Sequence, residues 1–288
     1  MSDAAMKIVV ASGKGGTGKS TVTANLAYSL SLTRDVAVVD CDVEEPNLHL
    51  FFPSASTDLP VTATIPEVDR SRCTFCGECG KFCRYGAISV LSDAVLIFPE
   101  LCHSCGGCAA VCPQGAIREV RRPIGMIRCS RPLPALTLIS GFLQEGEVQA
   151  PQVIHMAKML ADGHPLILYD SSPGIACPVI ETMDGSDVCI LVTESTPFGL
   201  HDLRLATEVA ERLNLPSGVV INRSDGRDEA ITEFCHEHGL PVLMTIPFDR
   251  EIAAVQNTGG LISRDLPGWN ERFIDLFAKV SELAGVRA

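Results

Sequence analysis

The most informative stretch of this 288-residue chain is Gly13-Lys14-Gly15-Gly16-Thr17-Gly18-Lys19-Ser20. It fits the pattern G-x-x-x-x-G-K-[ST] and lies between an apolar run at residues 7–12 and a helical pattern at residues 19–32. Glycines let successive backbone N–H groups turn toward phosphate oxygens, and the helix N-terminus adds partial positive charge. We therefore expect this octapeptide and Thr21 to bind ATP or ADP, with Lys19 on the β- and γ-phosphates and Ser20 on Mg²⁺.

Apolar strands alternate with helical patterns on both sides of the middle of the chain. This alternation predicts an α/β fold, in which a mostly parallel sheet is covered by helices on both faces. We expect strands at residues 7–12, 36–40, 166–170, 188–193, 218–222 and 242–246. We expect helices at residues 19–32, 151–161, 200–213, 229–237 and 270–284.

The middle of the chain replaces that alternation with a turn-rich block in which no long helix is expected. Of the 13 cysteines, eight fall in two runs, Cys73-x2-Cys76-x2-Cys79-x3-Cys83 and Cys102-x2-Cys105-x2-Cys108-x3-Cys112-Pro113. The runs form an internal repeat, because a Gly-Ala-Ile tripeptide follows each one. In a reducing compartment such a block predicts metal ligation and not a disulfide framework. We expect an insert at residues 61–123, with residues 1–60 and 124–288 forming one discontinuous domain.

The spacing of the two runs resembles that of bacterial two-cluster ferredoxins. The resemblance implies a small α+β, ferredoxin-like insert with two [4Fe–4S] clusters, in which the fourth cysteine of each run serves the other cluster. Arg84 stands where the first run would carry a proline. Zinc, which also binds paired Cys-x2-Cys motifs, is the alternative metal. The expected ligands are Cys73, Cys76, Cys79 and Cys112 for one cluster, and Cys102, Cys105, Cys108 and Cys83 for the other.

The phosphate loop resembles the deviant Walker A motif of the MinD/Mrp/ParA class of P-loop ATPases, because Lys14 precedes the glycines. In that class the first lysine reaches the partner's phosphates in a nucleotide-sandwiched homodimer. The resemblance therefore implies a nucleotide-dependent homodimer, in which Lys14 supplies charge in trans as an arginine finger does.

Other landmarks of this class follow in order along the chain. The resemblance implies that Asp42 orients the attacking water near Mg²⁺, that Asp170 holds Mg²⁺ through water, and that Gly174 senses the γ-phosphate. Asn222 would contact adenine, and Pro247 would help to wall the base. The expected catalytic residues are Lys14, Lys19 and Asp42, and the expected magnesium ligands are Ser20, Asp42 and Asp170.

Five cysteines lie outside the two runs. Cys41 and Cys189 lie in or beside apolar strands, so we expect them in the core. Cys177 follows Asp170 by seven residues, the offset at which the nitrogenase iron protein carries a cluster cysteine. A buried thiol is the default for Cys177, and a dimer-bridging cluster is the alternative.

The C-terminal pattern and the total charge bear on membranes and nucleic acids. Apolar residues recur at helical spacing in residues 273–284, and the polar face lacks a basic excess, so we expect a core helix and not a membrane tether. The net charge of −12 argues against sequence-independent binding to DNA or anionic lipid. No apolar run reaches about 18 residues, and the N-terminus resembles no export signal. We expect a cytoplasmic protein without a stable membrane anchor or nucleic-acid partner.

Three functions fit these features. In the first, nucleotide state controls electron transfer through two [4Fe–4S] clusters to a redox or iron–sulfur partner protein. In the second, the ATPase assembles or delivers iron–sulfur clusters. In the third, it is a regulatory or positioning ATPase whose clusters sense redox state. We favour the first, because two closely spaced clusters suit an electron relay, whereas a carrier needs a labile site.

Overall fold

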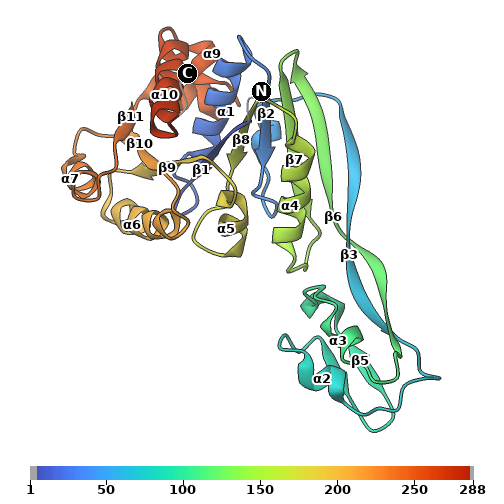
Figure 1. The fold of residues 1–288 in the computed structure, drawn as a ribbon. Coiled ribbons are helices and arrows are strands. Elements are labelled where there is room, and N and C mark those ends of the chain that lie inside the picture. The colour runs from blue at the N-terminus through green and yellow to red at the C-terminus, as the bar shows by residue number, and fades with distance from the viewer. Residues whose placement is uncertain (1–4, 286–288) are drawn as a thin grey trace.

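The computed structural model describes residues 5–285, and a nine-stranded sheet forms its centre (Figure 1). The strand order is β11-β10-β9-β1-β8-β2-β7-β6-β3. All neighbours from β11 to β7 are parallel, whereas β6 is antiparallel to both β7 and β3. The mostly parallel α/β sheet predicted from the sequence is therefore confirmed. The strands are β1 (Met6–Ala11), β2 (Val36–Asp40), β3 (Ser56–Val68), β6 (Ile117–Leu133), β7 (Leu136–Leu143), β8 (Leu166–Asp170), β9 (Val188–Glu194), β10 (Ser217–Ser224) and β11 (Val242–Pro247).

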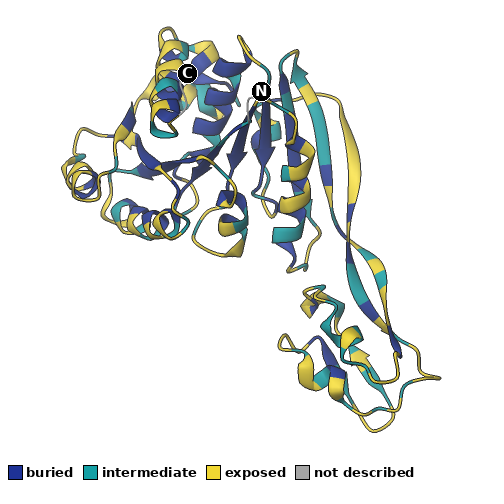
Figure 2. Ribbon diagram, viewed as in Figure 1, coloured by how far each residue is buried: buried dark blue, intermediate teal, exposed yellow. Residues whose placement is uncertain are grey.

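Helices cover both faces of the sheet because the parallel strands are apolar on both sides (Figure 2). Along β1, Ile8 and Val10 join one buried cluster, whereas Val9 and Ala11 join the other. Helices α1, α8, α9 and α10 pack into the first cluster, and α4, α5, α6 and α7 into the second. The helices are α1 (Lys19–Ser31), α4 (Ala150–Ala161), α5 (Cys177–Met183), α6 (Pro197–Arg212), α7 (Glu229–Glu237), α8 (Arg250–Asn257), α9 (Ile262–Asp265) and α10 (Trp269–Leu283).

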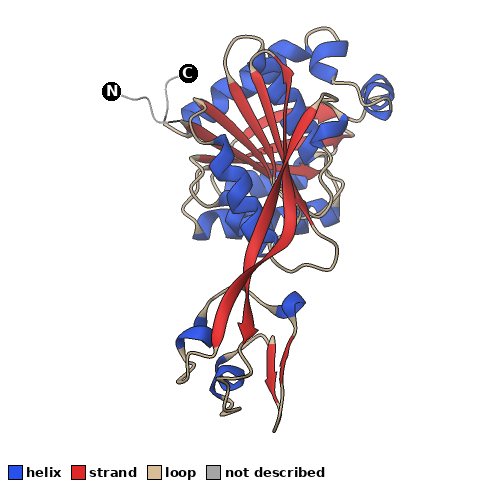
Figure 3. Cartoon of the chain, turned by 90° about the vertical axis from the view of Figure 1, so that its right-hand side faces the viewer, coloured by secondary structure: helices blue, strands red, loops and turns tan. Residues whose placement is uncertain are grey.

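A two-stranded ribbon of β3 and β6 carries the cysteine-rich segment away from the sheet (Figures 1 and 3). Because β3 and β7 are both antiparallel to β6, β3 runs in the direction of β7 and β2. The ribbon therefore extends beyond the carboxyl edge of the parallel strands, where open α/β sheets bind their ligands. The segment at its end contains α2 (Glu78–Phe82), β4 (Ile88–Val90), β5 (Val95–Ile97) and α3 (Gly107–Ala110).

A bulge lies where the ribbon leaves the sheet. Val61 pairs with Gly125 and Thr62 pairs with Pro123, so Ile124 is an extra residue on β6, and it is fully buried. Proline cannot donate to a strand ladder and is tolerated at bulges. A Cβ at Gly125 would lie 2.3 Å from the carbonyl oxygen of Phe142, so the crossing of β6 over β7 requires glycine.

The predicted strands and helices are all present, with ends shifted by at most three residues. The main error concerns residues 60–123, where the sequence pattern predicts only short, turn-rich structure. Instead, β3 and β6 run through the expected insert boundaries at residues 61 and 123, and β7 was also missed. Residues 61–65 of β3 do alternate apolar and polar side chains, with Val61 and Ala63 buried, but this signal is short, and residues 56–60 and much of β6 are exposed or half-buried. The division into two domains stays a prediction.

The C-terminal helix packs into the core through Trp269, Phe273, Leu276, Phe277 and Val280, so the prediction of a core helix is confirmed. Within residues 5–285, no helix combines the length and apolar character needed to span a bilayer.

Candidate functional site

The phosphate loop joins the end of β1 to the start of α1 at the carboxyl edge of the sheet. Gly16 and Gly18 have φ angles of 82° and 93°, in the backbone region that favours glycine. Gly18 is the N-cap of α1, and as a glycine it has no side chain that could cap the helix. The first N–H groups of α1 are therefore available to an anion. Lys19 is only 6% exposed, so the protein covers almost its entire side chain.

A cavity of about 540 Å³ lies against this loop. Besides the loop, Asp42, Asn47, Pro173, Arg223 and Asn257 line it, and they come from four different segments. Its volume falls in the range of roughly 300–1,000 Å³ that is usual for ligand pockets.

Asp170 ends β8 and is fully buried beside α1. Its Oδ1 accepts a 2.8 Å hydrogen bond from the Thr23 hydroxyl, whereas its Oδ2 has no hydrogen-bond partner among residues 5–285. Burial raises the pKa of Asp170, and the nearby Lys19 and Ser20 lower it. A buried, unpartnered carboxylate oxygen is costly. Together with the Ser20 hydroxyl it forms an oxygen donor set that fits Mg²⁺ or a water bound to it.

Asp40 organises the segment that carries Asp42. Its Oδ2 accepts hydrogen bonds from the N–H groups of Asn47 and Leu48, each at 2.9 Å, and its Oδ1 accepts one from Asp42 at 3.2 Å. Burial raises the pKa of Asp40, and the charge of Asp170 raises it further. Sequence reasoning gave Asp40 no role, although its position directly before the Asp42 segment was a usable signal.

Asp42 is half-buried and lines the cavity. Burial raises its pKa to about 6, with an opposing effect of Lys19 and a further increase from Asp170. A carboxylate that titrates so close to neutral pH can exchange a proton with a bound water at physiological pH.

Lys14 approaches Glu194, the last residue of β9, with its Nζ 3.7 Å from Oε2. Glu194 Oε1 also accepts a 2.7 Å hydrogen bond from Arg223 Nη1, which lies 3.1 Å from the carbonyl oxygen of Gly16. Sequence reasoning missed both Glu194 and Arg223, because neither belongs to a motif. Arg223 has a φ of 52°, a conformation that non-glycine residues seldom adopt.

The remaining predicted residues lie at different depths around the loop. Asn222 is buried, and its Nδ2 donates a 2.8 Å hydrogen bond to the carbonyl oxygen of Thr17. The N–H of Gly174 donates to the carbonyl oxygen of Ser12, at the end of β1. Pro247 is exposed at the end of β11 and is not part of the 540 Å³ cavity lining. The structure therefore brings Asn222 and Gly174 to the loop and leaves Pro247 at the surface.

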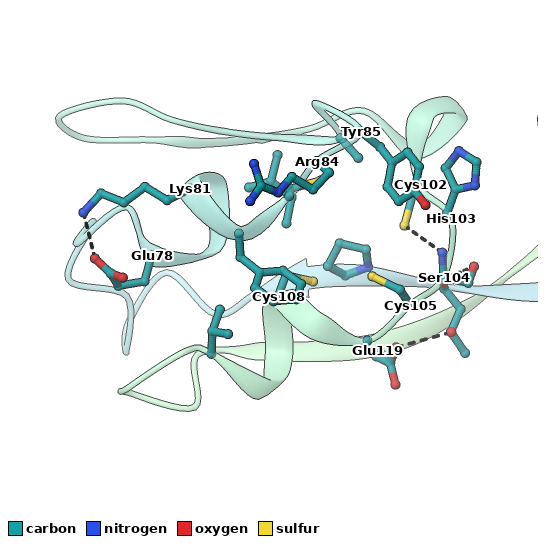
Figure 4. A pocket seen from close by; sticks show the side chains of 18 residues that line it. Glu78, Lys81, Arg84, Tyr85, Cys102, His103, Ser104, Cys105, Cys108 and Glu119 are labelled. Carbon is teal, nitrogen blue, oxygen red and sulfur yellow. Dashed lines mark hydrogen bonds and ion pairs between the residues drawn. The ribbon is translucent and has the colours of Figure 1, made fainter.

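The cysteine runs line two separate cavities in the segment beyond the ribbon. One, of about 610 Å³, is lined by Cys83 of the first run and Cys102, Cys105 and Cys108 of the second, here called the proximal quartet (Figure 4). The other is lined by Cys73, Cys76 and Cys79 of the first run and Cys112 of the second, here called the distal quartet. The distal cavity holds only about 20 Å³, so its loop would have to move outward to admit a cluster.

Both runs adopt the same unusual backbone. Phe75 and Ser104, at equivalent positions, have φ angles of 54° and 53°, and the glycines two residues later, Gly77 and Gly106, have φ angles of 83° and 70°. Left-handed non-glycine residues are strained and concentrate at functional sites. Two copies of one strained loop therefore present their cysteines in the same way.

The donor set of the quartets fits an iron–sulfur cluster. N–H groups of Ser104 and Ala116 donate to the Sγ atoms of Cys102 and Cys112 at 3.5 and 3.3 Å, as hydrogen bonds to cluster sulfurs do. Burial raises the pKa of Cys102 and that of Cys108, the latter to about 11, so a cation must replace these protons to yield thiolates.

Among residues 5–285, no three His, Cys, Asp or Glu side chains converge as ligands of a single metal ion. A [4Fe–4S] cluster differs from a single ion because each cysteine binds a different iron, so its ligands need not meet at one point.

The cysteines outside the runs divide by depth. Cys41 and Cys189 are fully buried, which confirms their prediction as core residues. Cys177 is exposed, so the default prediction of a buried thiol is wrong. The reason is its position at the start of the short helix α5, after a surface segment that follows Gly174.

Comparison with known proteins identifies related chains. Residues 8–262 match the family model described as the CobQ/CobB/MinD/ParA nucleotide binding domain. The chain is 33% identical to uncharacterized protein MJ0578 of Methanocaldococcus jannaschii over 246 residues, which cover 84% of this chain and 86% of that protein.

Two further similarities are more limited. The chain is 55% identical over 49 residues to an iron-sulfur cluster carrier protein of the same organism, covering 17% of each. It also superimposes on the septum site-determining protein MinD of Pyrococcus horikoshii, a structure solved with Mg-ADP, with a TM-score of 0.60, 22% identity and 99% coverage of both chains. At this identity the superposition shows a common fold.

Proposed function

The chain belongs to the CobQ/CobB/MinD/ParA nucleotide-binding family as an ATPase of the MinD/ParA type, and from this premise we propose that it couples nucleotide state to electron transfer through two [4Fe–4S] clusters. The quartets would hold the clusters, which supply one-electron redox chemistry when bound. The ATPase part would use nucleotide binding and hydrolysis to control access of a redox or iron–sulfur partner protein to them.

One observation carries this proposal: each cysteine quartet combines three cysteines of one run with the fourth of the other around its own cavity. Thiols brought together from both halves of a repeat form two four-cysteine sites, the number that a [4Fe–4S] cluster requires. The ribbon carries these sites beyond the carboxyl edge of the sheet, the edge at which the phosphate loop lies. This common edge supports a functional link between them.

In the nucleotide site, we assign phosphate binding to residues 13–21 and Mg²⁺ binding to Ser20 and Asp170. The unpartnered Oδ2 of Asp170 supports the magnesium assignment. Asp42 would orient the attacking water and contribute to the magnesium site, and its raised pKa supports exchange of a proton with that water. Asn222 and Pro247 remain proposed contacts for the base.

A homodimer would complete this site. Lys14 would leave Glu194, to which it is only loosely paired at 3.7 Å, and approach the phosphates of the partner. The Pyrococcus horikoshii relative binds Mg-ADP, which supports the same ligand here.

To test the proposal, the protein should be purified anaerobically and its iron and sulfide measured. Two clusters predict about eight irons per chain, four for each cluster. Potentiometric titration followed by EPR, with Mg-ADP and then a non-hydrolysable Mg-ATP analogue, should show a nucleotide-dependent shift in midpoint potential. The variant Lys19→Ala should keep both clusters and lose the shift. An iron content of about four or fewer per chain, or midpoint potentials that do not change with nucleotide, would contradict the proposal.

A second candidate, cluster delivery, is favoured by the 49-residue similarity to iron-sulfur cluster carrier proteins. The same preparation distinguishes the two, because a carrier should transfer its iron and sulfide to an apo-ferredoxin within minutes. An electron-transfer protein should retain both clusters during that incubation.

A further inference from the structure

The first residue before α4, Gln149, connects the ATPase part to the cysteine-rich segment. It is 5% exposed, and although it occupies the N-cap of α4, its side chain makes no capping hydrogen bond. Its Nε2 donates to the carbonyl oxygen of Cys102 at 2.9 Å, and its Oε1 lies 3.1 Å from the Ser104 hydroxyl. The side-chain amide of Gln149 therefore contacts the loop of the proximal quartet at two points.

Ser104 relays this contact to a cluster ligand. Its single hydroxyl proton is shared between two acceptors, the carbonyl oxygen of Thr64 on β3 at 2.7 Å and Gln149 Oε1 at 3.1 Å. Its backbone N–H donates to the Sγ of Cys102 at 3.5 Å (Figure 4). A residue with a strained positive φ keeps its conformation only when its surroundings hold it. Gln149 and Thr64 provide those surroundings for Ser104.

The elements on either side of Gln149, β7 and α4, also contact the segment that carries Asp42. The N–H of Leu143, at the end of β7, donates to the carbonyl oxygen of Val43, the residue that follows Asp42, at 2.8 Å. A Cβ at Gly141 would lie 2.6 Å from the Val43 side chain and 3.2 Å from that of Val153 in α4. Tight packing without spare volume joins the Asp42 segment to the first turns of α4.

The distal quartet has no equivalent connection. Its counterpart of Ser104 is Phe75, which has no hydroxyl. Within the described chain, the hydrogen bonds of residues 73–79 stay inside the cysteine-rich segment. The two quartets therefore differ in their attachment to the ATPase part, although their loops have the same backbone conformation.

We propose that Gln149 is a positioning residue that transmits the state of the nucleotide site to the proximal quartet and not to the distal one. The inference rests on the proposed function, because it requires clusters in the quartets. A hydrogen bond to a ligand sulfur strengthens when a cluster gains an electron, so it raises the reduction potential. Loss of the Gln149 contacts leaves Thr64 as the remaining support of Ser104, which weakens the N–H···S bond of Ser104 and lowers the potential of the proximal cluster.

The test compares Gln149→Met with Gln152→Met in the full-length, cluster-loaded protein. Methionine preserves the length of glutamine but removes both polar atoms, and Gln152 is a matched control because it makes only a marginal 3.5 Å contact from α4 to Thr62. Without nucleotide, Gln149→Met should lower one midpoint potential of two by about 59 mV, a tenfold change for a one-electron centre, and leave the other unchanged. Cys105→Ser, which alters the proximal signal alone, assigns the potentials.

Two further measurements distinguish the loss of the Gln149 contacts from misfolding of the variant. Ser104→Ala should lower the same potential without touching α4, and hydrogen exchange of residues 102–108 should accelerate in Gln149→Met but not in Gln152→Met. In the wild-type protein, a nucleotide-dependent shift should appear in the proximal cluster, and Gln149→Met should abolish it.

The outcomes separate this inference from the proposed function. Unchanged potentials in Gln149→Met, or equal changes of both clusters, overturn the inference while the nucleotide response of the wild type still supports the function. A wild-type protein with both clusters and no nucleotide response overturns the function and the transmission step. In that case, the change in midpoint potential that Gln149→Met causes without nucleotide is the measurement that decides whether Gln149 positions Ser104.

Discussion

Asn222 donates a hydrogen bond from its side-chain amide to the carbonyl oxygen of Thr17 at 2.8 Å, although 205 residues separate the two along the chain. A Cβ added to Gly18 would lie 2.2 Å from the same Nδ2 atom. The end of β10 therefore supports the phosphate loop closely, and this contact together with the φ of 93° at Gly18 favours glycine at this position.

Replacement of Gly18 by alanine should abolish nucleotide binding, because it displaces Asn222 as well as straining the loop. Gly16→Ala is the control, since Gly16 also has a positive φ but no atom lies within 4 Å of the place that an added Cβ would take. It should incur only the left-handed penalty of roughly 1–2 kcal/mol. Titration with a fluorescent Mg-ATP analogue measures both. Equal losses of affinity would show that backbone strain, and not the clash with Asn222, is responsible.

Removal of the Thr23 hydroxyl should destabilise the protein, because the buried Asp170 carboxylate then loses its donor. We expect Thr23→Val to lower the free energy of unfolding by about 1–3 kcal/mol. Thr207 offers a matched control, because its hydroxyl is buried in α6 without a hydrogen-bond partner in the described chain. Thr207→Val should change stability by less than about 0.5 kcal/mol or raise it. Urea unfolding at neutral pH measures both, and similar effects would argue against a role of the Thr23 bond.

The rate of ATP hydrolysis should rise with pH around the pKa of Asp42, which burial raises from 3.8 to about 6. Only the ionised carboxylate can accept a hydrogen bond and a proton from the attacking water. The pH profile of kcat/KM, which reports the groups of the free enzyme, should therefore rise below pH 6 and level off above it, and Asp42→Asn should remove this titration and lower kcat/KM by about 10²–10⁴-fold. Glu45→Gln, at the exposed rim of the same cavity, should retain it.

The raised pKa of Asp42 makes the stability of the protein fall with pH, whereas it makes the rate of hydrolysis rise. The folded protein binds the Asp42 proton more tightly than the unfolded chain does, so the contribution of this group to stability falls as pH rises from 3.8 to about 6. Asp42→Asn should therefore gain stability relative to the parent above pH 6, as measured by thermal unfolding. If the difference in stability between the parent and Asp42→Asn were the same at pH 4 and pH 7, this result would contradict the raised pKa of Asp42.

Single cysteine replacements should show that each cluster takes its ligands from both cysteine runs. Cys112→Ser lies in the second run, yet it should alter the EPR signal that Cys76→Ser also alters, because Cys112 lines the distal cavity. Cys83→Ser should alter the signal shared with Cys105→Ser. Cys177→Ser, at an exposed thiol, is the control and should leave iron content unchanged. A Cys112→Ser protein that shares its defect with Cys105→Ser would instead assign each cluster to a single run.

Local pattern was sufficient for a large part of this molecule. The phosphate loop could be predicted because its glycines and lysine act within one turn of the chain, and the buried strands because four or five consecutive apolar residues suit few other structures. Asp42 and Asp170 could be placed near one Mg²⁺ only through the resemblance to the MinD/Mrp/ParA class, because the adjacency of β2 and β8 was not predicted. The spacing of the cysteines likewise implied two groups of four.

The tertiary structure was needed wherever function depends on residues that no local pattern joins. The ribbon of β3 and β6 is stabilised mainly by pairing between segments about 60 residues apart, such as Thr64 with Arg121, and only residues 61–65 carry a local strand signal. Glu194, Arg223 and Gln149 are ordinary polar residues until folding places them beside the phosphate loop or the proximal quartet. The local preference for helix, strand or turn depends on consecutive residues, whereas a hydrogen bond between distant segments depends on the packing of everything between them.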